Sequence, residues 1–184
     1  YNNYAIILEP GYRERQNNPI NVYGYAYIYE FTNCTWTLKN TLFPNGSTYG
    51  LYDYYRYYEN FQLVAINDNY AVVGAPGYNV ASGAIYIYER NSNGNWGNEV
   101  SGQDYRSYTH RIEYNSQRSY FGFSVAISDT YIAVGMKYDK GNSPSNEGSS
   151  YIYEKNGTNW RQVGNILRAS GVTKAFQNFG WSVA

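Results

Sequence analysis

The chain repeats one sequence pattern three times at intervals of about sixty residues, and this repeat limits what it can fold into. The tetrapeptide Tyr-Ile-Tyr-Glu occurs at residues 27–30, 86–89 and 151–154. A glycine stands three residues before each copy, and a tryptophan follows seven or eight residues after its second tyrosine. These are Gly24, Gly83 and Gly148, and Trp36, Trp96 and Trp160. Self-similarity at this period indicates stacked repeats, each of which is one supersecondary unit.

Two further blocks recur in the same order. Residues 70–78 return as 4–12 and, in part, as 131–136, while residues 121–126 return as 179–184 and, weakly, as 60–65. We therefore divide the chain into repeats at about residues 1–59, 60–120 and 121–178, with 179–184 as strand one of the next or the first repeat.

Each repeat predicts four antiparallel strands. In the middle repeat these are residues 63–66, 70–75 and 83–89 and a fourth strand near Trp96, with a turn at 67–69. Turn residues bound each run, and no stretch keeps a period of 3.6 residues, so we expect almost no helix.

The third strand of a repeat has no charged face. Tyr25, Tyr27 and Tyr29 alternate with Ala26 and Ile28, so tyrosines line one face and small or aliphatic side chains line the other. A sheet of this kind must be covered on both sides, which the radial stacking of propeller blades achieves. We expect an all-β fold of three four-stranded propeller-type blades.

These blocks resemble the FG-GAP repeat family, whose propellers include the head of integrin α-chains. The resemblance rests on Phe121-Gly122 with Ser-Val-Ala at 124–126, on Gly-Ala-Pro at 74–76, and on the strand at 83–86. It covers essentially the whole chain, although the first copy has residues 8–10 (Leu-Glu-Pro) where Gly-Ala-Pro is expected. The resemblance implies β-propeller blades.

Many members of that family bind calcium in an Asp-rich loop between strands one and two. Here the loop is only residues 67–69 or 128–130, whereas calcium takes about six to eight oxygen ligands. The resemblance is therefore to the calcium-free branch, and we expect no metal and no cofactor.

The composition disfavours some partners. The 14 basic and 14 acidic residues cancel, which argues against a nucleic-acid or anionic-membrane surface. No apolar run approaches the roughly 20 residues of a membrane span. Tyrosine is abundant, at 25 of 184 residues, and its ring and hydroxyl suit a pleated sheet.

The two ends of the sequence are expected to fall within one blade. It stops at Ala184, after a first strand, and starts at Tyr1, before a second strand and without a signal-peptide pattern, so we expect a processed product or an excerpt. Three explanations stay open. The chain is part of a longer propeller, its last strand completes a neighbouring copy head to tail, or it closes on itself as a three-bladed ring. Propellers usually have about four to eight blades, so ring closure is the least favoured.

Three N-glycosylation sequons fall in predicted loops, at Asn33, Asn45 and Asn156. Asn33 and Asn156 occupy nearly the same place in their repeats, the turn before the fourth-strand tryptophan. A glycan at any of them would place the protein outside the cytosol. The one cysteine, Cys34, cannot form a disulfide within the chain, and we expect it to be buried or quiet rather than paired between chains.

Catalytic signals are weak. The one histidine, His110, lies in a predicted connection between blades, and Ser124 lies in a strand rather than at a nucleophile elbow. An aromatic stretch offers Tyr54, Tyr55 and Tyr57 as sugar or protein contacts, although packing between blades is the favoured interpretation.

Two functions are compatible with these features. The first is a non-enzymatic extracellular or cell-surface glycoprotein, structural or adhesive, whose copies assemble head to tail into a fibre by strand complementation. The second is a ligand- or carbohydrate-binding propeller fragment of a larger cell-surface protein. The expected partners are copies of the chain itself or the remaining blades of a longer chain, and N-linked glycans, with no nucleic acid and no membrane span.

Overall fold

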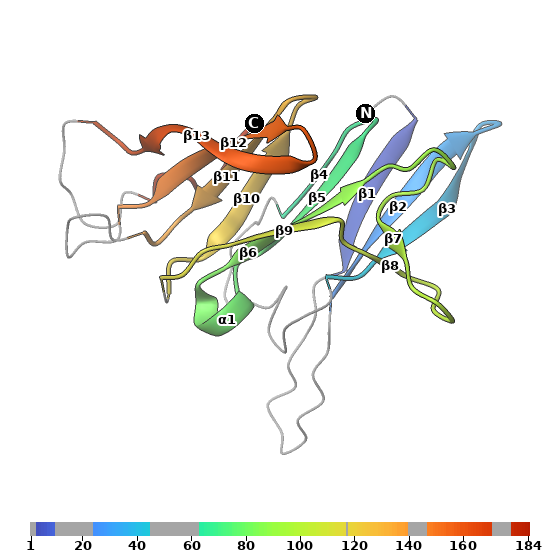
Figure 1. The fold of residues 1–184 in the computed structure, drawn as a ribbon, viewed down its shortest axis with the longest axis horizontal. Helices are drawn as coiled ribbons and strands as arrows, with labels where there is room; N and C mark the ends of the chain where they lie inside the picture. The colour runs from blue at the N-terminus through green and yellow to red at the C-terminus, as the bar shows by residue number, and fades with distance from the viewer. Residues whose placement is uncertain (1–2, 10–23, 45–62, 117, 140–146, 171–177) are drawn as a thin grey trace, which may run out of the picture.

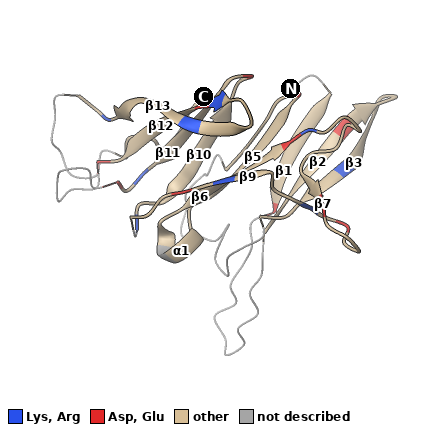
Figure 2. Cartoon of the chain, viewed as in Figure 1, with Lys and Arg blue, Asp and Glu red and all other residues tan. Residues whose placement is uncertain are grey.

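The computed structural model describes residues 3–9, 24–44, 63–116, 118–139, 147–170 and 178–184 (Figure 1). These residues form an all-β structure of three sheets, each built mainly from antiparallel pairs, together with one four-residue helix, α1 (Tyr78–Ala81). No helix in these ranges is long and apolar enough to span a membrane. Lys and Arg positions are interspersed with Asp and Glu positions along the sheets (Figure 2).

Each sheet takes most of its strands from one repeat. The first sheet contains β1 (Tyr4–Glu9), β2 (Tyr25–Thr32) and β3 (Thr35–Leu42), followed by β8 (Arg106–Ser107) and β7 (Asn98–Glu99). The middle sheet contains β4 (Val64–Ile66), β5 (Tyr70–Ala75), β6 (Ala84–Glu89) and β9 (His110–Glu113). The last sheet contains β10 (Phe121–Ile127), β11 (Tyr131–Met136), β12 (Ser149–Asn156) and β13 (Asn159–Leu167).

The strand pattern read from the sequence is confirmed for the first three strands of the middle repeat and wrong for the fourth. Trp96 forms only an isolated bridge with Arg90, and the fourth strand of the sheet is β9. His110 therefore lies in a strand and not in a connection between blades. The chain leaves the sheet at Gly97, where φ is +75° and a β-carbon would meet the Ser107 carbonyl oxygen at 2.4 Å. It then supplies β7 and β8 to the first sheet before it returns as β9.

The middle sheet lies between the other two and is buried on both faces (Figure 1). On the face toward the first sheet, Val73, Tyr86 and Tyr88 are fully buried in one hydrophobic cluster. On the opposite face, Ile85 and Ile87 are fully buried in a second cluster with the last sheet. The expected alternation is confirmed, because the tyrosines of β6 face the preceding sheet and the isoleucines face the following one.

The third strands of the outer sheets keep the same orientation. Ile28 of β2 is buried toward the middle sheet, while Tyr27 and Tyr29 lie on the outer face. In β12, Tyr151 and Tyr153 are buried toward the middle sheet. Every sheet thus directs its tyrosine face backward along the chain and its isoleucine face forward.

Glycines allow neighbouring sheets to touch backbone to backbone. A β-carbon at Gly74 in β5 would lie 2.1 Å from the carbonyl oxygen of Gly122 in β10. A β-carbon at Gly135 in β11 would lie 2.0 Å from the carbonyl oxygen of Gly180. Gly74 and Gly135 are equivalent positions in their repeats, so β10 lies against the middle sheet as the segment at Gly180 lies against the last sheet.

Two isolated bridges repeat this placement. Gly83 forms a parallel bridge with Phe121, and Gly148 forms the same bridge with Phe179. The segment 178–184 is therefore positioned on the last sheet in the way that β10 is positioned on the middle sheet. Ser124 strengthens the contact, because its buried hydroxyl donates a hydrogen bond of 2.9 Å to the Gly180 carbonyl oxygen.

Candidate functional site

A tyrosine–tryptophan contact joins each sheet to the next. The Trp96 ring meets the Tyr4 ring edge to face, with centroids 4.6 Å apart and an angle of 75° between the ring planes. The Trp160 ring meets the Tyr70 ring with centroids 5.3 Å apart and an angle of 83°. In both pairs the tyrosine is the first residue of a strand, β1 or β5, and the tryptophan belongs to the following repeat. The contact is therefore a recurring device for joining repeats.

A cation lies over each of these aromatic pairs. The guanidinium carbon of Arg90 is 4.9 Å from the Tyr4 ring centroid and 5.0 Å from that of Trp96. The ammonium of Lys155 is 5.1 Å from the Tyr70 ring centroid and 5.5 Å from that of Trp160. Cations over aromatic faces are attracted by the ring quadrupole, so each joint combines apolar burial with charge.

A glutamate stands opposite the tyrosine of each joint. Tyr4 pairs in register with Glu30 and donates a hydrogen bond of 3.0 Å to its carboxylate. Arg90 donates to the Tyr4 hydroxyl at 2.6 Å. Burial, followed by the hydrogen bond to Glu30, raises the pKa of Tyr4. At the second joint Lys155 lies 3.4 Å from the carboxylate of Glu89. The recurring glutamates thus take part in joining the repeats.

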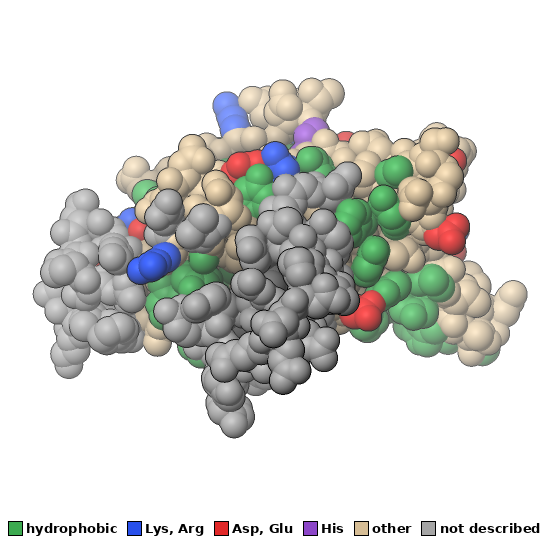
Figure 3. Space-filling view, turned by 90° about the horizontal axis from the view of Figure 1, so that it is seen from below, with side chains coloured by type: hydrophobic (Ala, Val, Ile, Leu, Met, Phe, Trp, Pro, Cys, Tyr) green, Lys and Arg blue, Asp and Glu red, His purple; other side chains and the backbone are tan. Residues whose placement is uncertain are grey.

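The tryptophan of the first repeat, which takes no part in either joint, is exposed on the outer face of the first sheet. Trp36 holds the place of Trp96 and Trp160 in its repeat, yet it is 49 % exposed. It packs against Phe31 on its own sheet, with ring centroids 5.1 Å apart, and Ile7 and Leu38 are exposed on the same face. Hydrophobic side chains reach the surface on the side of the molecule that carries this sheet (Figure 3).

The tyrosine of the last repeat that is equivalent to the tyrosines of the two joints is exposed on the last sheet. Tyr131 begins β11 as Tyr4 begins β1 and Tyr70 begins β5, and it stands opposite Glu154 in register. Its side chain is 46 % exposed. No tryptophan of the described ranges stacks on it, although its hydroxyl donates to the Glu154 carboxylate at 3.3 Å.

Within the described residues, β1 is the end strand of the first sheet. In the middle and last sheets, β5 and β11 each lie between two strands, because β4 and β10 precede them. At the equivalent place β1 pairs with β2 alone within the described part of the chain. Residues 181–184, which follow the Gly180 contact, belong to no strand. An edge of this kind exposes backbone donors and acceptors to a further strand.

Two of the three sequons lie at exposed hairpin tips. Asn33 occupies the two-residue turn between β2 and β3, with φ +51°, and Asn156 is the last residue of β12. Both side chains are exposed. Asn45 lies outside the described residues, as do Tyr54, Tyr55 and Tyr57.

Cys34 and His110 depart from the sequence expectation. Cys34 is exposed, which excludes the first of the two expected states, burial, and leaves the quiet thiol untested; the tight turn between β2 and β3 places it at the hairpin tip with φ +59°. His110 Nε2 lies 3.8 Å from the Glu89 carboxylate. Burial, and then the positive charge of Lys155, lowers the pKa of His110. The structure brings together no group of three or more His, Cys, Asp or Glu within its described ranges that could hold a metal ion.

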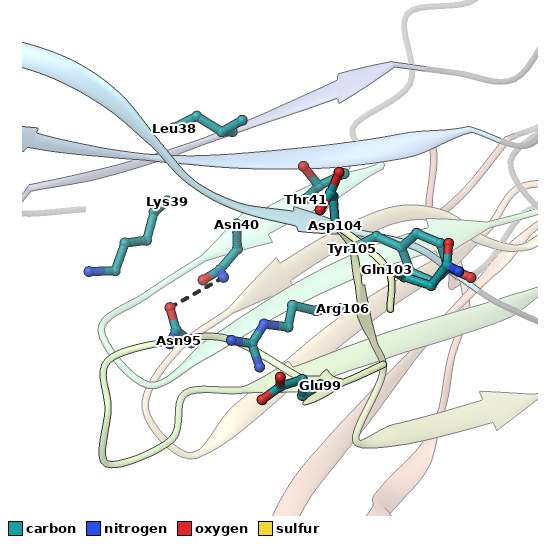
Figure 4. A pocket seen from close by; sticks show the side chains of 10 residues that line it. All are labelled: Leu38, Lys39, Asn40, Thr41, Asn95, Glu99, Gln103, Asp104, Tyr105 and Arg106. Carbon is teal, nitrogen blue, oxygen red and sulfur yellow. Dashed lines mark hydrogen bonds between the residues drawn. The ribbon is translucent and has the colours of Figure 1, made fainter. Parts of the chain in front are cut away.

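A polar groove of about 320 Å³ lies between β3 and the loops around β7 and β8 (Figure 4). Lys39, Glu99 and Arg106 line it beside Tyr105. Asn40 is engaged in the fold, because its amide donates to Asn95 at 3.3 Å and accepts from the Trp96 backbone at 3.1 Å. The sequence could not indicate this groove, since its walls come from two different repeats.

Residues 115–153 match the family model described as FG-GAP repeat. The matched range includes β10, β11 and most of β12. The resemblance read from the sequence is thereby confirmed for this range. No curated protein matches the chain.

Proposed function

We propose, from the match of residues 115–153 to the FG-GAP repeat model, that this chain is a non-enzymatic, extracellular or cell-surface protein with a structural or adhesive role. One observation carries the proposal: the Tyr–Trp–cation joint occurs twice between consecutive sheets. The recurring chemistry of the chain serves to stack repeats rather than to place a nucleophile, acid or base in a cleft.

The strands that each sheet takes from its own repeat then form one propeller-type blade. The blades correspond to about residues 1–59, 60–120 and 121–178, with 179–184 as strand one of a further blade. Support comes from the placement of Phe179 and Gly180 on the last sheet, which repeats that of Phe121 and Gly122 on the middle sheet.

Copies of the chain join head to tail into a fibre by strand complementation. In the last sheet, Ser124 pairs with Gly135 and Val125 with Val134. The equivalent register between two copies places Ser182 of one copy opposite Leu8 of the next, and Val183 opposite Ile7. Added strands of this kind gain affinity from backbone hydrogen bonds at an open sheet edge.

Glycans on Asn33, Asn45 and Asn156 fit this assignment. The two sequons at hairpin tips are exposed, so a bulky sugar there avoids the faces that stack.

Electron microscopy of the native material tests the proposed function. Filaments of many copies support it, whereas closed rings would support assembly between copies and refute the fibre. Hydrolytic activity that survives purification to homogeneity, with no assembly on the grid, would refute it.

The groove in Figure 4 favours a second candidate, a ligand- or carbohydrate-binding propeller. Its charged and amide side chains around Tyr105 suit the hydroxyl groups of a sugar. Tyr54, Tyr55 and Tyr57 remain proposed contacts for such a ligand. A glycan array would show binding that Arg106→Ala or Tyr54→Ala abolishes, and an array without binding would exclude this candidate.

A further inference from the structure

The geometry points to a specific junction between copies: Trp36 of one copy docks on Tyr131 of a second copy. This inference rests on the proposed head-to-tail assembly and names the side chains that join the copies.

The two joints within the chain supply the template. Trp96 docks on Tyr4 and Trp160 docks on Tyr70, in each case from a repeat to the one before it. Trp36 is the third tryptophan of the series, and Tyr131 is the third tyrosine. A single chain therefore carries both halves of one further joint.

Trp36 and Tyr131 are more exposed than the aromatic residues that form the two joints within the chain. Trp96 is fully buried and Trp160 is partly buried, whereas Trp36 is 49 % exposed. Tyr4 and Tyr70 are partly buried, whereas Tyr131 is 46 % exposed. Large exposed aromatic surfaces favour association, and tryptophan and tyrosine are enriched among the residues that dominate binding energy.

The occupant is a second copy of the chain, because the two faces are complementary in orientation. The first sheet presents an outer tyrosine face with Trp36, and within the chain such faces pack on the isoleucine face of a preceding sheet. The last sheet presents its isoleucine face beside Tyr131, partly covered by residues 178–184. A contact between two different faces of the same chain is heterologous, and it extends or closes into a ring.

The junction differs from the internal joints in its charge. Phe31 stands in the position of Arg90 and Lys155, one residue after the recurring glutamate. Glu154, beside Tyr131, is paired with Arg161 at 3.1 Å. The docking therefore leaves this carboxylate with its partner, and it depends on apolar contact rather than on an ion pair. We expect raising NaCl from about 0.1 M to 1 M to leave association unchanged or stronger.

Sedimentation velocity on the full chain and its variants tests the junction. Trp36→Ala and Tyr131→Ala should each weaken self-association by about 30-fold or more. Thr37→Ala is the matched control, because Thr37 is the exposed neighbour of Trp36 on the other face of β3, and it should associate like the unchanged chain. Circular dichroism and thermal unfolding establish that each variant is folded.

A mixture of the two variants gives the decisive readout. The Trp36→Ala copy keeps Tyr131, and the Tyr131→Ala copy keeps Trp36, so one intact junction can form between them. The mixture should produce a species of two chains, twice the 21.1 kDa of one chain, and nothing larger. A general loss of stability in either variant would not produce this pairing.

The outcomes separate the two proposals. If the unchanged chain assembles and both variants assemble equally well, the Trp36–Tyr131 junction is wrong while the proposed assembly stands. If the unchanged chain stays monomeric, both are wrong. If assembly stops at a ring of two chains, the junction is supported and the fibre is refuted.

Discussion

At Gly74 a single methyl group would collide with the neighbouring sheet. The β-carbon of an alanine would lie 2.1 Å from the Gly122 carbonyl oxygen, and this atom is backbone that cannot rotate away. The absence of a side chain therefore sets how closely the middle and last sheets pack.

Gly74→Ala should lower the free energy of unfolding by about 3 kcal/mol, since relief of the clash separates two packed sheets. Gly102→Ala is the comparison: no atom lies within 4 Å of its β-carbon, and only its φ of +73° opposes the change. We expect Gly102→Ala to lower the free energy of unfolding by about 1 kcal/mol. Urea unfolding of both variants measures the difference, and equal losses would contradict the close packing.

The Tyr88 hydroxyl is a polar group within an apolar cluster. The side chain is fully buried, and its hydroxyl has no hydrogen-bond partner in the described structure. Tyr88→Phe should therefore raise the free energy of unfolding by about 1 kcal/mol, because a buried unpaired hydroxyl is costly. Tyr151→Phe is the contrast, since its hydroxyl bonds to that of Tyr114 at 3.2 Å, and it should lower stability by about 1 kcal/mol. A loss from Tyr88→Phe would show that this hydroxyl is satisfied.

Buried tyrosines predict a loss of stability at high pH. Burial raises the pKa of Tyr153 to about 12 from a value of 10.0. Because the folded pKa lies above the unfolded one, the contribution is complete below pH 10 and is lost as pH rises toward 12. The free energy of unfolding should fall as pH rises across this window, and in the Tyr153→Phe variant it should fall less steeply. A variant whose profile is identical to that of the unchanged chain would contradict a buried Tyr153.

At the scale of strands, the sequence indicates those elements whose alternation and turns agree. Residues 70–75 form β5 as predicted, since Tyr70 follows a tight turn and a Pro-Gly pair follows Ala75. The prediction of a fourth strand near Trp96 was wrong, because Trp96 is fixed by contacts with another repeat, through the Tyr4 ring and the Asn40 side chain. Long-range contacts of this kind leave no local pattern.

The candidate junction could be predicted only in part from the sequence. The spacing of Trp36 and Tyr131 places them in two recurring series, but the sequence does not say which faces are covered. That information comes from the packing of three sheets, in which Trp96 and Trp160 are buried and Trp36 is not.

Hairpin tips should carry the glycans. Asn33→Gln and Asn156→Gln should each reduce the intact mass of the natural protein by one glycan, because both tips are exposed. Asn93 lies in an exposed turn without a sequon, so Asn93→Gln serves as the control and should leave the glycan mass unchanged. A natural chain whose mass is unaltered by glycosidase would contradict the assignment.

Across the whole molecule, stability comes from contacts between neighbouring sheets. One hydrophobic cluster joins the first and middle sheets, and a second joins the middle and last. In arrays of this kind each repeat depends on its neighbours, and terminal faces require a cover. The exposed tyrosine face of the first sheet and the Tyr131 face of the last sheet are the two outer faces of the described residues.

The native mass in solution tests most directly whether these two faces cover each other. Sedimentation equilibrium of the full chain, produced without glycans, over a range of concentrations should show species at whole-number multiples of 21.1 kDa, with the larger ones favoured as concentration rises. A single stable species of 21.1 kDa at every concentration would contradict the account.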